Sequence, residues 1–299
     1  MNNGRDTSIA NHTKINRGIA LVLLATVGFG LNPLFARWAY SGGLTAETAL
    51  FYRFVFPALF LFPFIFKKGY DTSAAVKAIM LGVFVGLGTI TYFRSIAQVP
   101  VATAALIYFT HPLFTILLTS IFFREPLTGK SLFVAGLVVA ACGLILSPGK
   151  LSERQLWALG MSFLMPLSFA TLMIGFEQWL HILPLWPRTA LTLWGQVVII
   201  VPVLLFVPFD TIMPLTGLGW TGVIGLATVS SLLPQVLMAG GIPLTGATRA
   251  SVLGTAELLT SLLAGWIILS ELIQWRELVG AGLIFVAIYV SRPAKYVEL

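Results

Sequence analysis

AALIYFTHPLFTILLTSIFFREPLTGKSLFVAGLVVAAC, at residues 104–142, aligns without a gap on ASVLGTAELLTSLLAGWIILSELIQWRELVGAGLIFVAI, at residues 250–288. The two segments lie 146 residues apart, and ten of their paired positions are identical. These pairs are Ala104/Ala250, Leu113/Leu259, Leu117/Leu263, Ile121/Ile267, Glu125/Glu271, Leu132/Leu278, Ala135/Ala281, Gly136/Gly282, Leu137/Leu283 and Ala141/Ala287. A repeat of about half the chain indicates two related halves.

The composition places the chain in a lipid bilayer. It is 58% hydrophobic and only 10% charged, and its mean hydropathy is +0.94. A soluble domain carries roughly 25% charged residues. The net charge of +7 does not indicate a nucleic-acid partner, because the basic residues stand singly or in pairs between apolar runs. Cys142 is the single cysteine, so an intramolecular disulfide is excluded.

The apolar runs predict an all-α integral membrane protein with ten transmembrane helices. A spanning helix needs about 20 apolar residues. The predicted spans are 18–40, 46–66, 76–97, 101–123, 130–147, 155–180, 186–207, 217–241, 246–270 and 275–291. We therefore divide the chain into an N-terminal tail (1–17), a first five-helix repeat (18–147), a second one (155–291) and a C-terminal tail (292–299).

The positive charges predict the orientation, since Lys and Arg collect in cytoplasmic loops. With both tails in the cytoplasm, twelve basic residues in the tails, in the loops or at the ends of spans fall on that side: Arg5, Lys14, Arg17, Lys67, Lys68, Lys77, Arg124, Lys130, Arg188, Arg249, Arg292 and Lys295. Lys150, Arg154 and Arg276 fall outside. Because five helices is an odd number, the second repeat enters the membrane in the opposite direction. Such inverted repeats enclose a midplane site in transporters.

The two five-helix units, each with a Glu after its fourth helix (Glu125 and Glu271) and then a Lys or Arg and a Gly-containing fifth helix, resemble the EamA family of the drug/metabolite transporter superfamily. Within it, the chain looks most like the YddG-type exporters of aromatic amino acids and paraquat. The resemblance implies ten helices, with the first four of each repeat around a central cavity. It also implies a bacterial inner-membrane protein that expels amino acids, other metabolites or toxic cations.

Glu257 and His111 are the leading candidates for the site. They are equivalent in the repeat, and each lies about ten residues into its span, about 15 Å deep. Many family members have an acidic residue at the position of Glu257, whereas the first repeat has His111-Pro112 there, so a carboxylate role does not carry over to the first half. Ionisable residues at this depth are functional candidates. The pair would suit a proton-linked or amine-binding site, and the alternative is a structural hydrogen bond between packed helices.

Helical spacing and mid-span proline breaks extend this face. The predicted substrate-binding residues are Asn32, Tyr92, Tyr108, His111, Ser168, Gln235 and Glu257. Arg53 lies deeper than Arg37 and Arg94 and needs a partner, for which Glu47 is a candidate. Close helix packing is expected at the following glycines: Gly82, Gly86, Gly136, Gly143, Gly280 and Gly282. Two of these, Gly136 and Gly282, would also serve a homodimer contact through the outer helices.

The sequence contains no zinc-site, nucleophile-elbow or P-loop motif. We therefore expect no enzyme activity, catalytic residue, metal or cofactor, and no direct drive by ATP. The prediction is a secondary transporter that exports aromatic or other apolar amino acids and related metabolites or toxins, with lipid as its surroundings. Two alternatives stay open: an exporter of drugs or other organic cations, and a membrane sensor or scaffold that transports nothing.

Overall fold

The computed structural model describes residues 3–66, 69–96, 107–146, 152–208, 211–269 and 275–290. In these ranges every regular element is a helix. The first half contains α1 (Asn3–Gly30), α2 (Asn32–Ser41), α3 (Ala46–Leu61), η1 (Phe62–Phe66), α4 (Thr72–Ile96), α6 (His111–Phe123) and α7 (Gly129–Leu146). The second contains α8 (Glu153–Ser162), α9 (Leu164–Gln178), α10 (Leu185–Ile200), η2 (Val201–Phe206), α11 (Gly217–Ala227), η4 (Thr228–Leu232), α12 (Leu233–Thr245), α13 (Ala247–Gly254), α14 (Ala256–Leu269) and α15 (Trp275–Val290).

Seven helical stretches in the described ranges are long and apolar enough to cross a membrane. They are Thr13–Ser41, Ala46–Phe66, Thr72–Tyr92, Leu156–Gln178, Leu185–Phe206, Gly217–Thr245 and Ala247–Ile268. Three shorter apolar helices, His111–Phe123, Gly129–Ala141 and Leu278–Val290, lie over the remaining predicted spans. The prediction of a multi-pass, all-helical membrane protein is confirmed.

Some predicted boundaries differ from the observed ones. Helix α1 begins at Asn3 instead of at the predicted span start, residue 18, so part of the expected N-terminal tail is helical. Its polar residues extend the helix ahead of the apolar span, and hydropathy detects only the apolar part. The predicted C-terminal tail and Glu271 lie outside the described residues.

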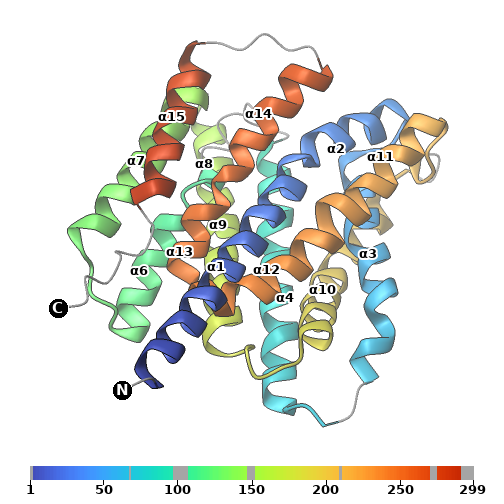
Figure 1. Cartoon of the computed structure of the whole chain (residues 1–299). Helices are drawn as coiled ribbons and strands as arrows, with labels where there is room; N and C mark the ends of the chain where they lie inside the picture. Colours follow the sequence, from blue (N-terminus) through green and yellow to red (C-terminus); the bar gives the residue numbers. More distant parts are fainter. Residues whose placement is uncertain are drawn as a thin grey trace.

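Helices from the two halves interleave. Helix α1 packs on α12 and α14, whereas α4 packs on α9 and α10. Figure 1 shows α1 passing through the middle of the bundle, with α7 and α15 side by side at its left edge. The largest apolar core joins α1, α4, α9, α12 and α13. The interior is therefore built by both halves together.

Glycine permits a close helix crossing between α4 and α10. A Cβ added at Gly82 would lie 2.1 Å from the carbonyl oxygen of Thr192, and one at Gly195 would lie 2.2 Å from that of Ile79. Gly86 also faces α10 closely, so its predicted packing role is confirmed. At Gly136, Gly143 and Gly282 nothing lies within 4 Å of an added Cβ. The prediction of close packing within one chain was wrong there, because sequence does not reveal which helix face meets a neighbour.

Several spans are broken rather than continuous. Helices α1 and α2 are separated at Leu31, just before Pro33, and α13 and α14 are separated at Thr255. Proline explains the first break, since it is favoured in the first turn of a helix and lacks a backbone donor. A π-helical turn, η4, lies between α11 and α12. Such breaks place backbone and side chains towards the interior at mid-depth.

Candidate functional site

Glu257 lies in the first turn of α14, directly after the break at Thr255. The break is stabilised locally, because the Thr255 hydroxyl donates to the carbonyl oxygen of Val252 at 2.7 Å. A helix N-terminus carries a partial positive charge that favours a carboxylate. The start of α14 thus favours the ionised carboxylate of Glu257, which is partly buried there.

Tyr108 joins Glu257 to a cluster of aromatic rings. Its hydroxyl donates to Glu257 Oε2 at 3.3 Å. Its ring centroid lies 6.1 Å from that of Tyr92, 5.4 Å from that of His111 and 5.8 Å from that of Phe169. These side chains come from α4, the start of α6, α9 and, for Tyr108, the helical residues 107–108 just before the turn that precedes α6. Three predicted site residues, Tyr92, Tyr108 and Glu257, are therefore brought together.

His111 belongs to the same cluster. It is the first residue of α6, is 1% exposed, and packs edge-on against Phe169 with ring centroids 5.2 Å apart. A Cβ added at Gly254 would lie 3.5 Å from its Cε1 atom, so the ring faces the end of α13. Its Nδ1 atom is buried without a hydrogen-bond partner. The repeat-equivalent residues His111 and Glu257 are thus linked through Tyr108, which contacts both.

Arg53 supplies a positive charge to this cluster. It lies on α3 and interacts electrostatically with Glu257, Tyr108, Tyr40 and Tyr92. The proposed partner Glu47 instead interacts with Tyr40. The Nε atom of Arg53 is buried without a hydrogen-bond partner. Sequence reasoning left Arg53 out of the site, although its depth in a span was the signal that could have included it.

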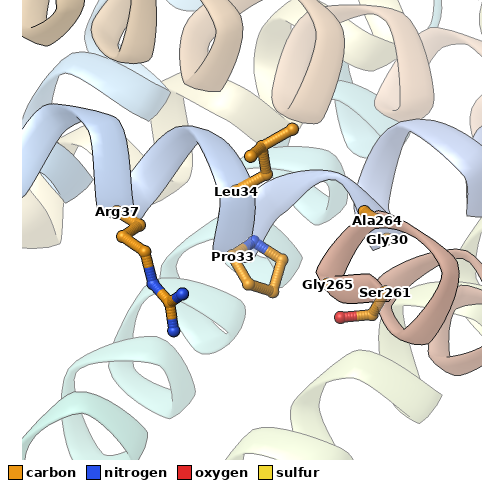
Figure 2. A pocket seen from close by; sticks show the side chains of 7 residues that line it. All are labelled: Gly30, Pro33, Leu34, Arg37, Ser261, Ala264 and Gly265. Carbon is orange, nitrogen blue, oxygen red and sulfur yellow. The ribbon is translucent and has the colours of Figure 1, made fainter. Parts of the chain in front are cut away.

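A small cavity of about 130 Å³ lies beside this cluster, between α2 and α14. Figure 2 shows Pro33, Leu34 and Arg37 along one side and Ser261 and Gly265 on the other. Gly30 closes it at the level of the site, since a Cβ there would lie 2.6 Å from the carbonyl oxygen of Glu257. Ser261 follows Glu257 by one helical turn. The cavity therefore lies along α14 beyond Glu257, with Ser261, Ala264 and Gly265 in its wall.

The remaining predicted residues occupy other positions. Asn32 is partly buried at the start of α2, directly before Pro33 of the cavity wall. Gln235 donates to Ser231 Oγ at 3.0 Å and accepts from Gln196 Nε2 at 3.4 Å, in a polar contact between α10, α12 and η4. Ser168 is fully buried against Gly88, and its hydroxyl donates to the carbonyl oxygen of Met165.

Phe169, the neighbour of Ser168, is the residue that contacts Tyr108 and His111. The sequence contained a signal for it, because Gly28-Phe29-Gly30 is echoed by Ser168-Phe169-Ala170. Among the described residues, no group of three His, Cys, Asp or Glu side chains could hold a metal ion. The site thus combines one carboxylate, one guanidinium, an imidazole and aromatic walls.

Comparison with known proteins identifies the family. The model of the EamA-like transporter family matches residues 16–147 and residues 156–292. The chain belongs to the EamA-like transporter family.

Individual relatives of this EamA-like transporter are distant. The S-adenosylmethionine uptake transporter of Rickettsia felis is 31% identical over 135 residues, which span 44% of each chain. The pseudopaline exporter CntI of Pseudomonas aeruginosa is 24% identical over 94% of this chain and 98% of its own length. One solved crystal structure has a TM-score of 0.77 at 13% identity, over 92% of this chain and 96% of that chain. This last similarity concerns the fold.

Proposed function

We propose that this EamA-like transporter is a secondary transporter that exports amino acids, aromatic or other apolar ones, by alternating access. The observation that carries the proposal is the partly buried hydrogen bond between Tyr108 and Glu257, which lies beside several aromatic rings. A carboxylate there would bind the ammonium group of the solute. The rings of Tyr92, Tyr108 and Phe169 would pack against its apolar side chain.

The cost of burying charge supports a binding role. Removing a carboxylate or a guanidinium from water costs several kcal/mol per ion, and mutual attraction returns this only with good geometry and further hydrogen bonds. Here Arg53 Nε and His111 Nδ1 are buried and lack hydrogen-bond partners. A solute that occupies the cluster would satisfy such groups. A purely structural pair would instead be expected to saturate its own donors.

The architecture proposed for this function is ten helices in two inverted repeats, with N- and C-termini in the cytoplasm of a bacterium and the helices in its inner membrane. The family model's match to two successive segments of similar length supports it. So does the packing of α1 on α14 in one place and of α9 on α6 in the other, which are equivalent contacts between the halves. The two halves would rock about the Glu257 cluster and open each side in turn.

The direction of transport, export, is itself part of the proposal. An alternating-access fold permits transport in either direction, and the solute and ion gradients decide which one occurs. One relative bears the name of an uptake transporter and another that of an exporter. A homodimer is proposed through the outer face of α7 and α15, where Gly136 and Gly282 are exposed.

The test is flux in liposomes that contain the purified protein. We expect uptake of labelled phenylalanine, suppressed by excess unlabelled tryptophan or leucine. Glu257→Gln should reduce the rate at least tenfold, because the neutral amide cannot pair with an ammonium group. The matched control is Glu153→Gln, at an exposed carboxylate in the first turn of α8. A response to an imposed pH gradient would identify proton coupling.

Three results would reject the proposal. Unchanged flux in both Glu257→Gln and His111→Ala would show that the central cluster does not bind the solute. Flux of organic cations without flux of any amino acid would establish the alternative, a multidrug or organic-cation exporter. Ligand binding without flux of any solute would indicate a sensor or scaffold.

A further inference from the structure

Arg53 is a second charged group in the interior that the amine-binding role of Glu257 does not explain. It lies seven residues after the start of α3 (Ala46–Leu61), which places it about 10 Å along that helix. Its side chain is partly buried, its Nε atom is fully buried without a hydrogen-bond partner, and its guanidinium lies 5.3 Å from the Phe54 ring centroid. An arginine in this state has at least one donor available for an anionic group.

The groups that interact electrostatically with Arg53 come from several helices, and two of them, Tyr108 and Glu257, are joined by a hydrogen bond. Tyr40 belongs to α2, Tyr92 to α4, Tyr108 to the segment just before α6, and Glu257 to α14. Glu257 is the only carboxylate among these partners, and its Oε2 atom already accepts the hydroxyl of Tyr108. The cluster therefore has one positive pole on α3 and one negative pole on α14, with phenol groups between them.

We propose that Arg53 binds the carboxylate of the transported solute while Glu257 binds its ammonium group, so that the site selects zwitterions. This inference rests on the proposed function and adds Arg53 as the residue that selects α-amino acids over amines and acids of the same shape. A guanidinium presents paired N–H donors that match both oxygens of a carboxylate. A zwitterion pairs with both poles and adds no net charge to the interior.

A simple organic cation fits the same site poorly. It would pair with Glu257 but leave Arg53 facing a second positive charge in a medium of low dielectric constant, where such repulsion is strong. An acid without an amine would meet the opposite difficulty at Glu257. The site thus selects zwitterions in two ways. It pairs with both charged groups of a zwitterion, and it leaves Arg53 or Glu257 without a partner when any other solute binds. Arg53 is then the residue that separates amino acids from amines of the same shape.

The experiment compares two solutes that share one side chain, phenylalanine and phenethylamine, the second of which lacks the carboxylate. Purified wild-type protein in liposomes should transport phenylalanine, and excess phenethylamine should compete at least tenfold more weakly than excess unlabelled phenylalanine. In Arg53→Gln this preference should fall at least tenfold or reverse, mainly through a higher KM for phenylalanine. That magnitude corresponds to the loss of hydrogen bonds to charged groups. Arg94→Gln, which removes an exposed arginine of α4, should keep the wild-type preference.

Arg53→Lys covers the case in which Arg53→Gln fails to fold. It retains the charge and loses the paired donors, so we expect an intermediate preference. The wild-type protein provides a test that needs no variant, because phenylalaninamide should compete as weakly as phenethylamine. Equal competition by the zwitterion and its amide, or an unchanged preference in Arg53→Gln, would overturn the role of Arg53 and leave the proposed transport of amino acids intact. If the wild type carries no amino acid at all, the proposed function itself fails.

Discussion

Tyr108 connects the parts of the site, because its ring and its hydroxyl have different partners. The ring lies among Tyr92, His111 and Phe169, whereas the hydroxyl donates to Glu257 at 3.3 Å. The ring positions the phenol, and the phenol orients the carboxylate. At the residue scale, the site therefore consists of charges held by aromatic neighbours.

Tyr108→Phe separates these two roles. The ring remains, so folding should be unaffected, while Glu257 loses one donor. We expect the KM for phenylalanine to rise about threefold to tenfold with a smaller change in maximal rate, because a long hydrogen bond to a charged group contributes modestly.

Initial rates over a range of phenylalanine concentrations would measure this effect. Tyr289→Phe is the matched control, since Tyr289 lies exposed on α15. A loss of maximal rate without a change in KM would show that the hydroxyl serves the conformational cycle rather than binding.

At the element scale, the interior depends on helices that approach closely at a few glycines. The crossing of α4 and α10 brings Gly82 against the Thr192 carbonyl, which is backbone and has little room to move. This crossing joins one helix of each half. Its tightness fixes how α4, with Tyr92 of the site, is placed relative to the second half.

Gly82→Ala should destabilise the protein, although alanine is the better helix former by about 1 kcal/mol. The added methyl group would lie 2.1 Å from the Thr192 oxygen, and such overpacking costs typically 1–3 kcal/mol or more. We expect a clear fall in the apparent melting temperature in detergent.

Gly136→Ala should not destabilise the protein, in contrast to Gly82→Ala. Nothing lies within 4 Å of a Cβ at Gly136, so its melting temperature should stay constant or rise slightly. This expectation applies to monomeric protein in detergent. In the homodimer proposed through this face, the added methyl group would lie in the interface, and a fall as large as that of Gly82→Ala would indicate the dimer.

At the scale of the whole molecule, the distribution of positive charge predicts a single orientation in the membrane. Both termini would lie in the cytoplasm, and the connection after α2 would lie outside. Figure 1 shows α1 starting at the lower end of the view and α2 lying at its upper end. The start of α1 and the end of α2 therefore report on opposite sides of the bundle.

Labelling of single cysteines in a Cys142→Ser background would test this orientation. A membrane-impermeant maleimide should label Ser41→Cys in intact cells and Thr13→Cys only after permeabilisation, since both side chains are exposed. Neither substitution alters the charge that sets the orientation. The reverse pattern would show that both termini lie outside and would overturn the predicted orientation.

The sequence by itself determined that the protein lies in a lipid bilayer, that it is helical and to which family it belongs. These follow from hydropathy and from a repeat in residues 104–142 and 250–288, because apolar length and internal similarity are properties of the chain alone. It also selected Glu257, His111, Tyr92 and Tyr108, since charge and polarity at mid-span depth are visible without coordinates.

Only the tertiary structure decided which of these side chains meet. The electrostatic partner of Arg53 is Glu257 rather than Glu47. The residue that packs against His111 is Phe169 rather than its neighbour Ser168. Gln235 pairs with Gln196. The tertiary structure also separated the glycines that contact another helix from those that face outward. The physical reason is that a helical pattern fixes a residue's depth and face, whereas the neighbour on that face depends on how distant helices cross.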